Sequence, residues 1–220
     1  MVGPKVKKYF LSYGLIKVMV DEILAYYFKD AGYADVEILK TPLGYRVVIY
    51  SEHPGRLIGR GGAVLKKIAA VLQNRVGLEN VSITVSPVPN PDLNARVVAF
   101  RIARLLERGV PYRRLIMFTL RRVMEAGALG CEIIISGKLR GERAAFEKLR
   151  TGKVYKAGEI VDHIVDRAVA HALLKPGVYG IEVIIVKPVM QLPDQVVIKE
   201  LSQAEIEKIK QEVGSLAETR

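Results

Sequence analysis

The sequence predicts an α/β (α+β) fold in two parts, because helix-like and strand-like segments alternate and a proline-rich stretch divides them. That stretch, Ser86–Pro91, holds three prolines within five residues. Proline lacks a backbone donor and restricts the residue before it, so neither a helix nor a sheet ladder continues through it. Half of the residues are apolar and 26% are charged, which is typical of a globular chain.

The boundary organises the whole chain of 220 residues. We expect a first domain over residues 1–86, a linker over 87–92, a second domain over 93–190 and a C-terminal extension over 191–220. A short helix is expected in the extension, because Ser202–Glu205 has capping-box spacing. This helix either packs on its own body or docks on a neighbouring protein, and the sequence leaves both open.

The first part contains the signals of a helix, two strands, a broken turn, a second helix and a strand. The segments are a helix over Lys17–Ala31 closed by Gly32, strands over 36–39 and 45–50, a short turn over 56–58, a helix to about Val76 and a strand over 81–85. The last strand alternates apolar and polar residues, as a half-buried strand does.

A glycine-rich loop, Gly59-Arg60-Gly61-Gly62, precedes the second helix. It is neither a Walker loop nor a dinucleotide loop, because Ala63-Val64 follows it where those motifs need other residues. It does fit G-x-x-G between two helices, where glycines let the backbone approach a sugar-phosphate chain and a helix N-terminus offers N–H donors. A glycine turn alone is commonly structural; the helices and strands around this one favour RNA. The candidate contacts are Arg56, Gly59, Arg60, Gly61, Gly62, Lys66 and Lys67.

Two arginine-rich helices are predicted at the start of the second part, over about Pro91–Arg108 and Tyr112–Ala126, with Asn90 as the first N-cap. They carry eight arginines against three carboxylates. The first helix places four arginines opposite its apolar face, namely Arg96, Arg101, Arg104 and Arg108. Because the arginine fork suits phosphate, we interpret these faces as RNA-binding, with solvated amphipathic faces as the alternative.

Strands and a basic loop complete the second part. A strand is predicted over Glu132–Ser136, and the loop after it carries three cations, Lys138, Arg140 and Arg143. Two further strands are predicted over residues 159–173 and 179–186, although the first of them has mixed helix and strand character.

The charge balance points to a polyanionic partner. The chain has 34 basic and 23 acidic side chains, a net charge of +11. Residues 1–86 carry 12 and 7 of them, residues 87–190 carry 18 and 10, and residues 191–220 carry 4 and 6. A spread over both parts favours a folded nucleic-acid-binding surface over a membrane anchor or simple solubility.

Several classes of protein are excluded by the composition. Cys131 is the only cysteine, so neither a disulfide framework nor a cysteine metal cage is expected. No apolar run approaches the ~18 residues of a spanning helix, and the charges at Lys17, Asp21 and Glu22 argue against a secretion signal. We therefore expect a cytoplasmic location, no membrane association and no cofactor or small-molecule substrate.

Three stretches together resemble the S-three family of small-subunit ribosomal proteins in its archaeal and eukaryotic form. They are Ile58–Gly62, Asn90–Arg96 and Ser136–Ala144. The resemblance spans roughly residues 1–190. It implies a type II KH domain followed by a second α/β ribosomal domain, with helices packed on a small mixed sheet. It also implies a place in the small-subunit head, with rRNA, mRNA and neighbouring head proteins as partners.

The resemblance further implies that the second helix of the second domain faces the channel through which mRNA enters. Basic residues there are linked to unwinding mRNA in the family, and the matching pair here is Arg113 and Arg114. A third basic position of bacterial relatives falls at Met117, which predicts weaker unwinding unless Arg121 compensates for the missing cation.

Two alternatives to a non-enzymatic ribosomal protein stay open at this point. A free KH-domain regulator of RNA processing would also carry the glycine loop. A nucleic-acid-cleaving enzyme would need carboxylates gathered by folding around the three histidines, of which His163 and His171 share a face if they lie on one strand.

Overall fold

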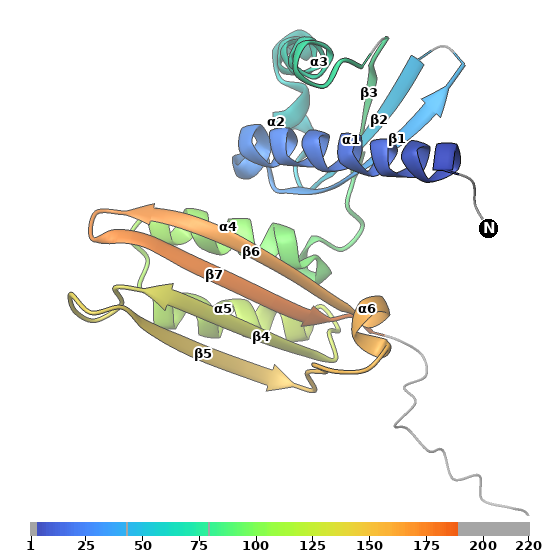
Figure 1. Ribbon diagram of the computed structural model, residues 1–220. Helices are drawn as coiled ribbons and strands as arrows, with labels where there is room; N and C mark the ends of the chain where they lie inside the picture. Colours follow the sequence, from blue (N-terminus) through green and yellow to red (C-terminus); the bar gives the residue numbers. More distant parts are fainter. Residues whose placement is uncertain (1–3, 43, 79, 189–220) are drawn as a thin grey trace, which may run out of the picture. The chain divides into compact units, whose positions relative to one another are not determined.

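The computed structural model describes residues 4–42, 44–78 and 80–188, shown as a ribbon in Figure 1. The helix predicted in the C-terminal extension lies outside these residues. We refer to residues 4–87 as the first half and to residues 88–188 as the second half. In each, helices pack on a sheet, so the predicted α/β class is confirmed.

The elements of the first half follow the predicted order. They are α1 (Pro4–Phe28), β1 (Tyr33–Thr41), β2 (Gly44–Ser51), α2 (Pro54–Ile58), α3 (Ala63–Val76) and β3 (Ser82–Pro87). The sheet has the order β1-β2-β3, with an antiparallel first pair and a parallel second pair. Helix α1 begins well before the predicted Lys17, because one interior glycine, Gly14, costs a helix only about 1 kcal/mol.

The core of the first half lies between the sheet and helices α1 and α3. Strand β1 alternates buried Val36 and Ile38 with exposed neighbours, so one face of the sheet is covered. The covering residues include Leu24 from α1 and Leu72 from α3, both fully buried. This packing fixes α3, and with it the glycine loop that precedes it.

The second half is a four-stranded sheet with two long helices on one face (Figure 1). Its elements are α4 (Ala95–Glu107), α5 (Tyr112–Glu125), β4 (Gly130–Gly137), β5 (Ala145–Gly152), α6 (Ile160–Ile164), β6 (Val165–Leu174) and β7 (Gly177–Val186). The strand order is β5-β4-β7-β6 and every pair is antiparallel. We expected parallel and antiparallel pairs in this sheet, and that detail of the prediction is wrong. Strands β4–β5 and β6–β7 are joined directly as antiparallel pairs, and β7 also pairs antiparallel with β4.

Three local predictions in the second half are corrected. Asn94, not Asn90, caps α4, and its side chain accepts hydrogen bonds from the N–H groups of Arg96 and Val97. The segment predicted as one strand over 159–173 is the short helix α6 followed by β6. Strand β5 was not predicted at all, because its alternation of exposed and half-buried residues leaves few apolar side chains to recognise.

Cys131 lies in the core of the second half, where burial raises the pKa of its thiol to about 12. The thiol therefore stays protonated and unreactive at neutral pH. Among the helices that the structure describes, none combines the length and apolarity needed to cross a bilayer.

Candidate nucleic-acid interface

The glycine loop is shaped by backbone conformations that only glycine adopts easily. Gly59 ends α2 with φ 67° and ψ −178°. A Cβ at this position would lie 2.6 Å from Cγ2 of Val64, so the loop must pass close to the start of α3. Because both the conformation and the space exclude a side chain, Gly59 is required by the turn itself.

Gly61 and Gly62 leave an open surface next to that turn. Both have left-handed φ values, 60° and 73°, yet a Cβ at either position would meet no atom within 4 Å. Helix α3 starts directly after Gly62 without a side-chain cap and without an acidic residue in its first turn. The Ala63 N–H donates to the carbonyl oxygen of Arg60, so the start of α3 attracts an anion that approaches over the two glycines mainly through the positive end of its dipole.

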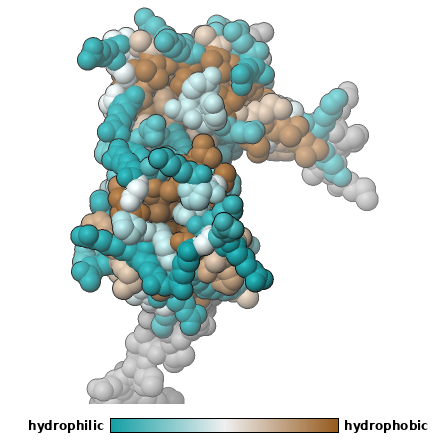
Figure 2. Space-filling view, turned by 90° about the vertical axis from the view of Figure 1, so that its left-hand side faces the viewer, coloured by the Kyte–Doolittle hydropathy of each residue, from teal (hydrophilic) through white to brown (hydrophobic). Residues whose placement is uncertain are grey.

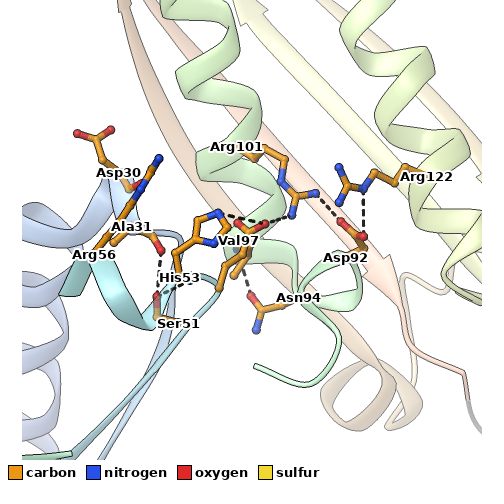
Figure 3. Close-up of polar contacts among 11 residues, drawn as sticks. Asp30, Ala31, Ser51, His53, Arg56, Asp92, Asn94, Val97, Arg101 and Arg122 are labelled. Carbon is orange, nitrogen blue, oxygen red and sulfur yellow. Dashed lines mark hydrogen bonds and ion pairs between the residues drawn. The ribbon is translucent and has the colours of Figure 1, made fainter. Parts of the chain in front are cut away.

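The cations predicted around the loop are exposed. Arg60, Lys66 and Lys67 form no ion pair with any residue that the structure describes. Arg56 is tethered by a hydrogen bond of 3.2 Å from Nη1 to the carbonyl oxygen of Asp30, which fixes the side chain without neutralising its charge (Figure 3). The seven predicted residues therefore gather on one segment, Arg56–Lys67, around an uncapped helix N-terminus.

A second basic surface is organised by Glu147 of β5. Its carboxylate accepts from Arg113 Nε at 3.0 Å and lies 3.5 Å from Arg140 Nη2, while Arg140 Nε donates to the Tyr112 hydroxyl at 3.4 Å. Tyr112 and the two arginines lower the pKa of Glu147, which stays ionised. One carboxylate thus holds the start of α5 and the loop between β4 and β5 side by side.

Four other predicted cations on this surface are exposed. Within the described ranges they take part in no ion pair, and they are Arg114, Arg121, Lys138 and Arg143. They lie on α5 and on the loop that Glu147 joins to it. This basic surface consists of Arg113, Arg114, Arg121, Lys138, Arg140 and Arg143, and we call it the α5 surface.

Two of the four arginines on the predicted α4 face, Arg96 and Arg101, are paired with carboxylates, which corrects their interpretation as RNA contacts. Arg96 makes two hydrogen bonds of 2.7 Å to Asp21 of α1, and its guanidinium lies 5.1 Å from the centre of the Tyr33 ring. Burial opposes ionisation of Asp21, but hydrogen bonds from Arg96 and Tyr33 outweigh it and lower the pKa of the carboxyl. Arg96 is therefore occupied by the first half of the chain.

Arg101 is occupied in the same way (Figure 3). It donates to Glu52, which follows β2, at 2.6 Å and also to Asp92, which in turn accepts from Arg122 at 3.0 Å. Only 16% of the Arg101 side chain is exposed. At the far end of α4, Glu107 pairs with Lys29 at 3.0 Å. Sequence reasoning missed these pairs because their partners lie far away in the chain.

The α5 surface also contains a residue that the sequence did not single out. Phe118 is 62% exposed, on the side of α5 opposite the buried residues Leu115, Ile116, Thr119, Leu120 and Val123. The sequence could have identified Phe118, because it follows Arg114 by four residues and residues four apart share a helix face.

The histidines do not form a catalytic group in the described residues. His163 lies in α6 and His171 in β6, so they do not share a strand as supposed. No cluster of three or more potential metal-ligating side chains is found among residues 4–42, 44–78 and 80–188.

Comparisons with known proteins match both halves of the chain. The chain matches the model of the KH domain over residues 19–93 and that of the ribosomal protein S3 C-terminal domain over residues 102–185. It is 64% identical to small ribosomal subunit protein uS3 of Staphylothermus marinus, covering 94% of this chain and 92% of that protein. The proteins of the same name from Sulfurisphaera tokodaii and Saccharolobus solfataricus are 56% and 51% identical, covering 89% and 90% of this chain and 86% of each relative.

Proposed function

The chain belongs to the S3 family of small ribosomal subunit proteins, and on that premise we propose that its two basic surfaces bind different RNAs. As a member of this family it is a structural constituent of the small ribosomal subunit, associated with rRNA, and not an enzyme. The free regulator and the nucleic-acid-cleaving enzyme are accordingly not favoured.

The glycine loop binds the backbone of rRNA. The observation that carries this proposal is the open surface over Gly61 and Gly62 at the uncapped start of α3. Phosphate groups there would be attracted by the positive end of the α3 dipole, with Arg60, Lys66 and Lys67 close enough in sequence to supply charge. The absence of an acidic residue from the first turn of α3 supports an anionic ligand.

The α5 surface faces mRNA at the channel through which it enters. Arg113 and Arg140 are positioned by Glu147, and Arg114 and Arg121 present guanidinium groups that are unpaired among the described residues. Arginine binds phosphate by two parallel hydrogen bonds, so several such groups on one helix suit a passing strand.

The wider organisation is also part of the proposal. We assign residues 1–86 to the KH domain, 87–92 to the linker, 93–190 to the C-terminal domain and 191–220 to an extension of unassigned role.

Neighbouring proteins of the subunit head are proposed to cover α1, which exposes large apolar side chains. These include Tyr9, Phe10, Leu11, Leu15, Val18, Tyr26 and Tyr27. Apolar patches are visible among hydrophilic side chains in Figure 2. Assembled in this way, the protein works in the cytoplasm.

The first test asks whether the positive charge of the glycine loop serves rRNA binding. In a cell lysate sedimented through a high-salt gradient, the protein should travel with small subunits; recovery only among soluble proteins would contradict the ribosomal role.

In the purified chain, Arg60→Glu with Lys66→Glu should weaken rRNA binding and flatten its salt dependence by roughly two units of slope. An unchanged slope would remove the loop from the RNA surface.

The second test separates mRNA from rRNA at the α5 surface. Arg113→Ala with Arg114→Ala should leave incorporation into small subunits intact and slow translation of an mRNA with a stable hairpin, compared with an unstructured one. Loss of incorporation would instead make the two arginines rRNA contacts.

A further inference from the structure

We propose that Phe118, on the exposed side of α5, stacks on an unpaired base of the RNA held by the α5 surface. The inference rests on the proposed function of that surface and names the chemistry that it recognises: single-stranded RNA, through a base as well as through phosphates. It starts from a large apolar side chain that the fold leaves uncovered.

Phe118 does not contribute to the core. Helix α5 buries one face on the sheet, and Phe118 lies outside it with 62% of its surface exposed. Met117 beside it is 59% exposed. Two large apolar residues adjacent on an exposed helix face cost solubility and add nothing to packing, so they are typical of a contact surface.

The charges around Phe118 indicate an anionic partner. Arg114 precedes it by one turn, and Arg121 and Arg122 follow it by three and four residues, so all three neighbour Phe118 on the helix surface. Glu125 lies one turn beyond Arg121 and is the acidic side chain of this face. Arg122 is held by Asp92, whereas Arg114 and Arg121 have no ion-pair partner among the described residues.

An aromatic ring between arginines suits single-stranded RNA better than duplex RNA. In a duplex the faces of the bases are stacked on one another and only phosphates and groove edges are offered to a helix. In a single strand the bases are free to stack on an aromatic side chain while the phosphates pair with neighbouring cations. Phe118 thus gives the α5 surface a means of distinguishing unpaired from paired RNA.

The position of Met117 is explained by the same arrangement. The resemblance to bacterial relatives places a third cation there, but here the large apolar residues Met117 and Phe118 occupy the stretch of helix between Arg114 and Arg121. The surface therefore exchanges one phosphate contact for a base contact. Such a contact is insensitive to salt, whereas each phosphate contact is weakened by it.

The test is binding of the full-length chain to fluorescently labelled oligoadenylate, compared with a hairpin duplex, over a range of salt concentrations. Phe118→Ala should weaken binding to oligoadenylate about fivefold or more, with the salt slope unchanged and little effect on the duplex. Phe118→Trp should bind at least as tightly as the original chain, because it keeps an aromatic ring. Arg114→Ala should lower affinity and reduce the slope by about 0.7.

Matched variants keep the outcome decisive. Phe10→Ala removes a phenylalanine of similar exposure, 65%, from α1 and should leave binding unchanged. If Phe118→Leu binds oligoadenylate as well as the original chain, an apolar contact suffices without an aromatic ring, and the inference is overturned. An unchanged affinity in Phe118→Ala overturns it as well. If Arg114→Ala with Arg121→Ala also has no effect, the proposed mRNA surface fails; if only the arginines matter, that surface stands without the stacking.

Discussion

Helices α4 and α5 carry equal numbers of arginines in the sequence regions that predict them, and in each region two of the four are paired with carboxylates, but the partners come from different parts of the fold. On α4, Arg96 and Arg101 are paired with carboxylates from the first half. On α5, Arg113 and Arg122 are paired within the second half, with Glu147 and Asp92, whereas Arg114 and Arg121 have no partner in the part of the chain described. The two helices have similar sequences of charge. They differ because α4, and not α5, contacts Asp21 and Glu52 of the first half. A positive helix face therefore indicates RNA only once the acidic groups of the rest of the fold have been placed.

The largest expected effect is on the pairing of α4. Arg101→Ala removes the shared partner of Glu52 and Asp92 from a nearly buried site, leaving two carboxylates close together. We expect the free energy of unfolding to fall by about 2–3 kcal/mol, below the full cost of breaking a wholly buried pair because some exposure remains. Urea denaturation measures it. A loss under about 0.5 kcal/mol would mean that α4 is held by its apolar contacts alone.

A smaller effect, with a defined pH dependence, is expected at Asp21. Asp21→Asn should destabilise the chain by about 1–2 kcal/mol at pH 7, since Arg96 loses its charged partner. The folded state lowers the pKa of Asp21, so the carboxylate contributes stability that is present above about pH 4. That stability is lost as the pH falls through the folded-state pKa.

The pH profile provides the control for Asp21. Stability curves of the original chain and of Asp21→Asn should converge on going from pH 7 to pH 3. A difference that stays constant over this range would show that the amide disturbs packing and that the charge of Asp21 contributes nothing.

The smallest effect on stability is expected from α5. Arg114→Ala with Arg121→Ala should change the free energy of unfolding by less than about 0.5 kcal/mol, because both side chains are exposed. The same variant should weaken binding of single-stranded RNA and reduce the salt slope by about 1.4, the value for two lost phosphate contacts. Destabilisation by about 2 kcal/mol without a change in slope would reverse the comparison between the helices.

Features encoded locally were predictable from the sequence. The turn at Gly59–Gly62 was identified because its glycines and the following helix are neighbours in the chain, and the structure gives each of these glycines a positive φ. Likewise, alternating burial in β1 and the apolar stripe of α5 follow from periodicity alone. The division of the charge between the two parts was also visible.

Features that depend on distant contacts were not predictable. The ion pairs Arg96–Asp21 and Arg101–Glu52 join residues separated by 75 and 49 positions, and nothing near either arginine indicates these two partners. Strand β5 exists because it pairs with β4, and its Glu147 then organises the α5 surface. Asn90 and Asn94 both have capping chemistry, and the contacts of the following helix decide between them.

The central claim, that Arg96 and Arg101 of α4 hold the two halves together while Arg114 and Arg121 of α5 meet RNA, can be tested by chemical modification. The full-length chain is treated with phenylglyoxal, with and without single-stranded RNA, and modified arginines are located by mass spectrometry. We expect Arg114 and Arg121 to react in the free protein and to be protected by RNA, with Arg101 slow to react in both samples. Rapid modification of Arg101 in the free protein, with protection only on adding RNA, would contradict the claim.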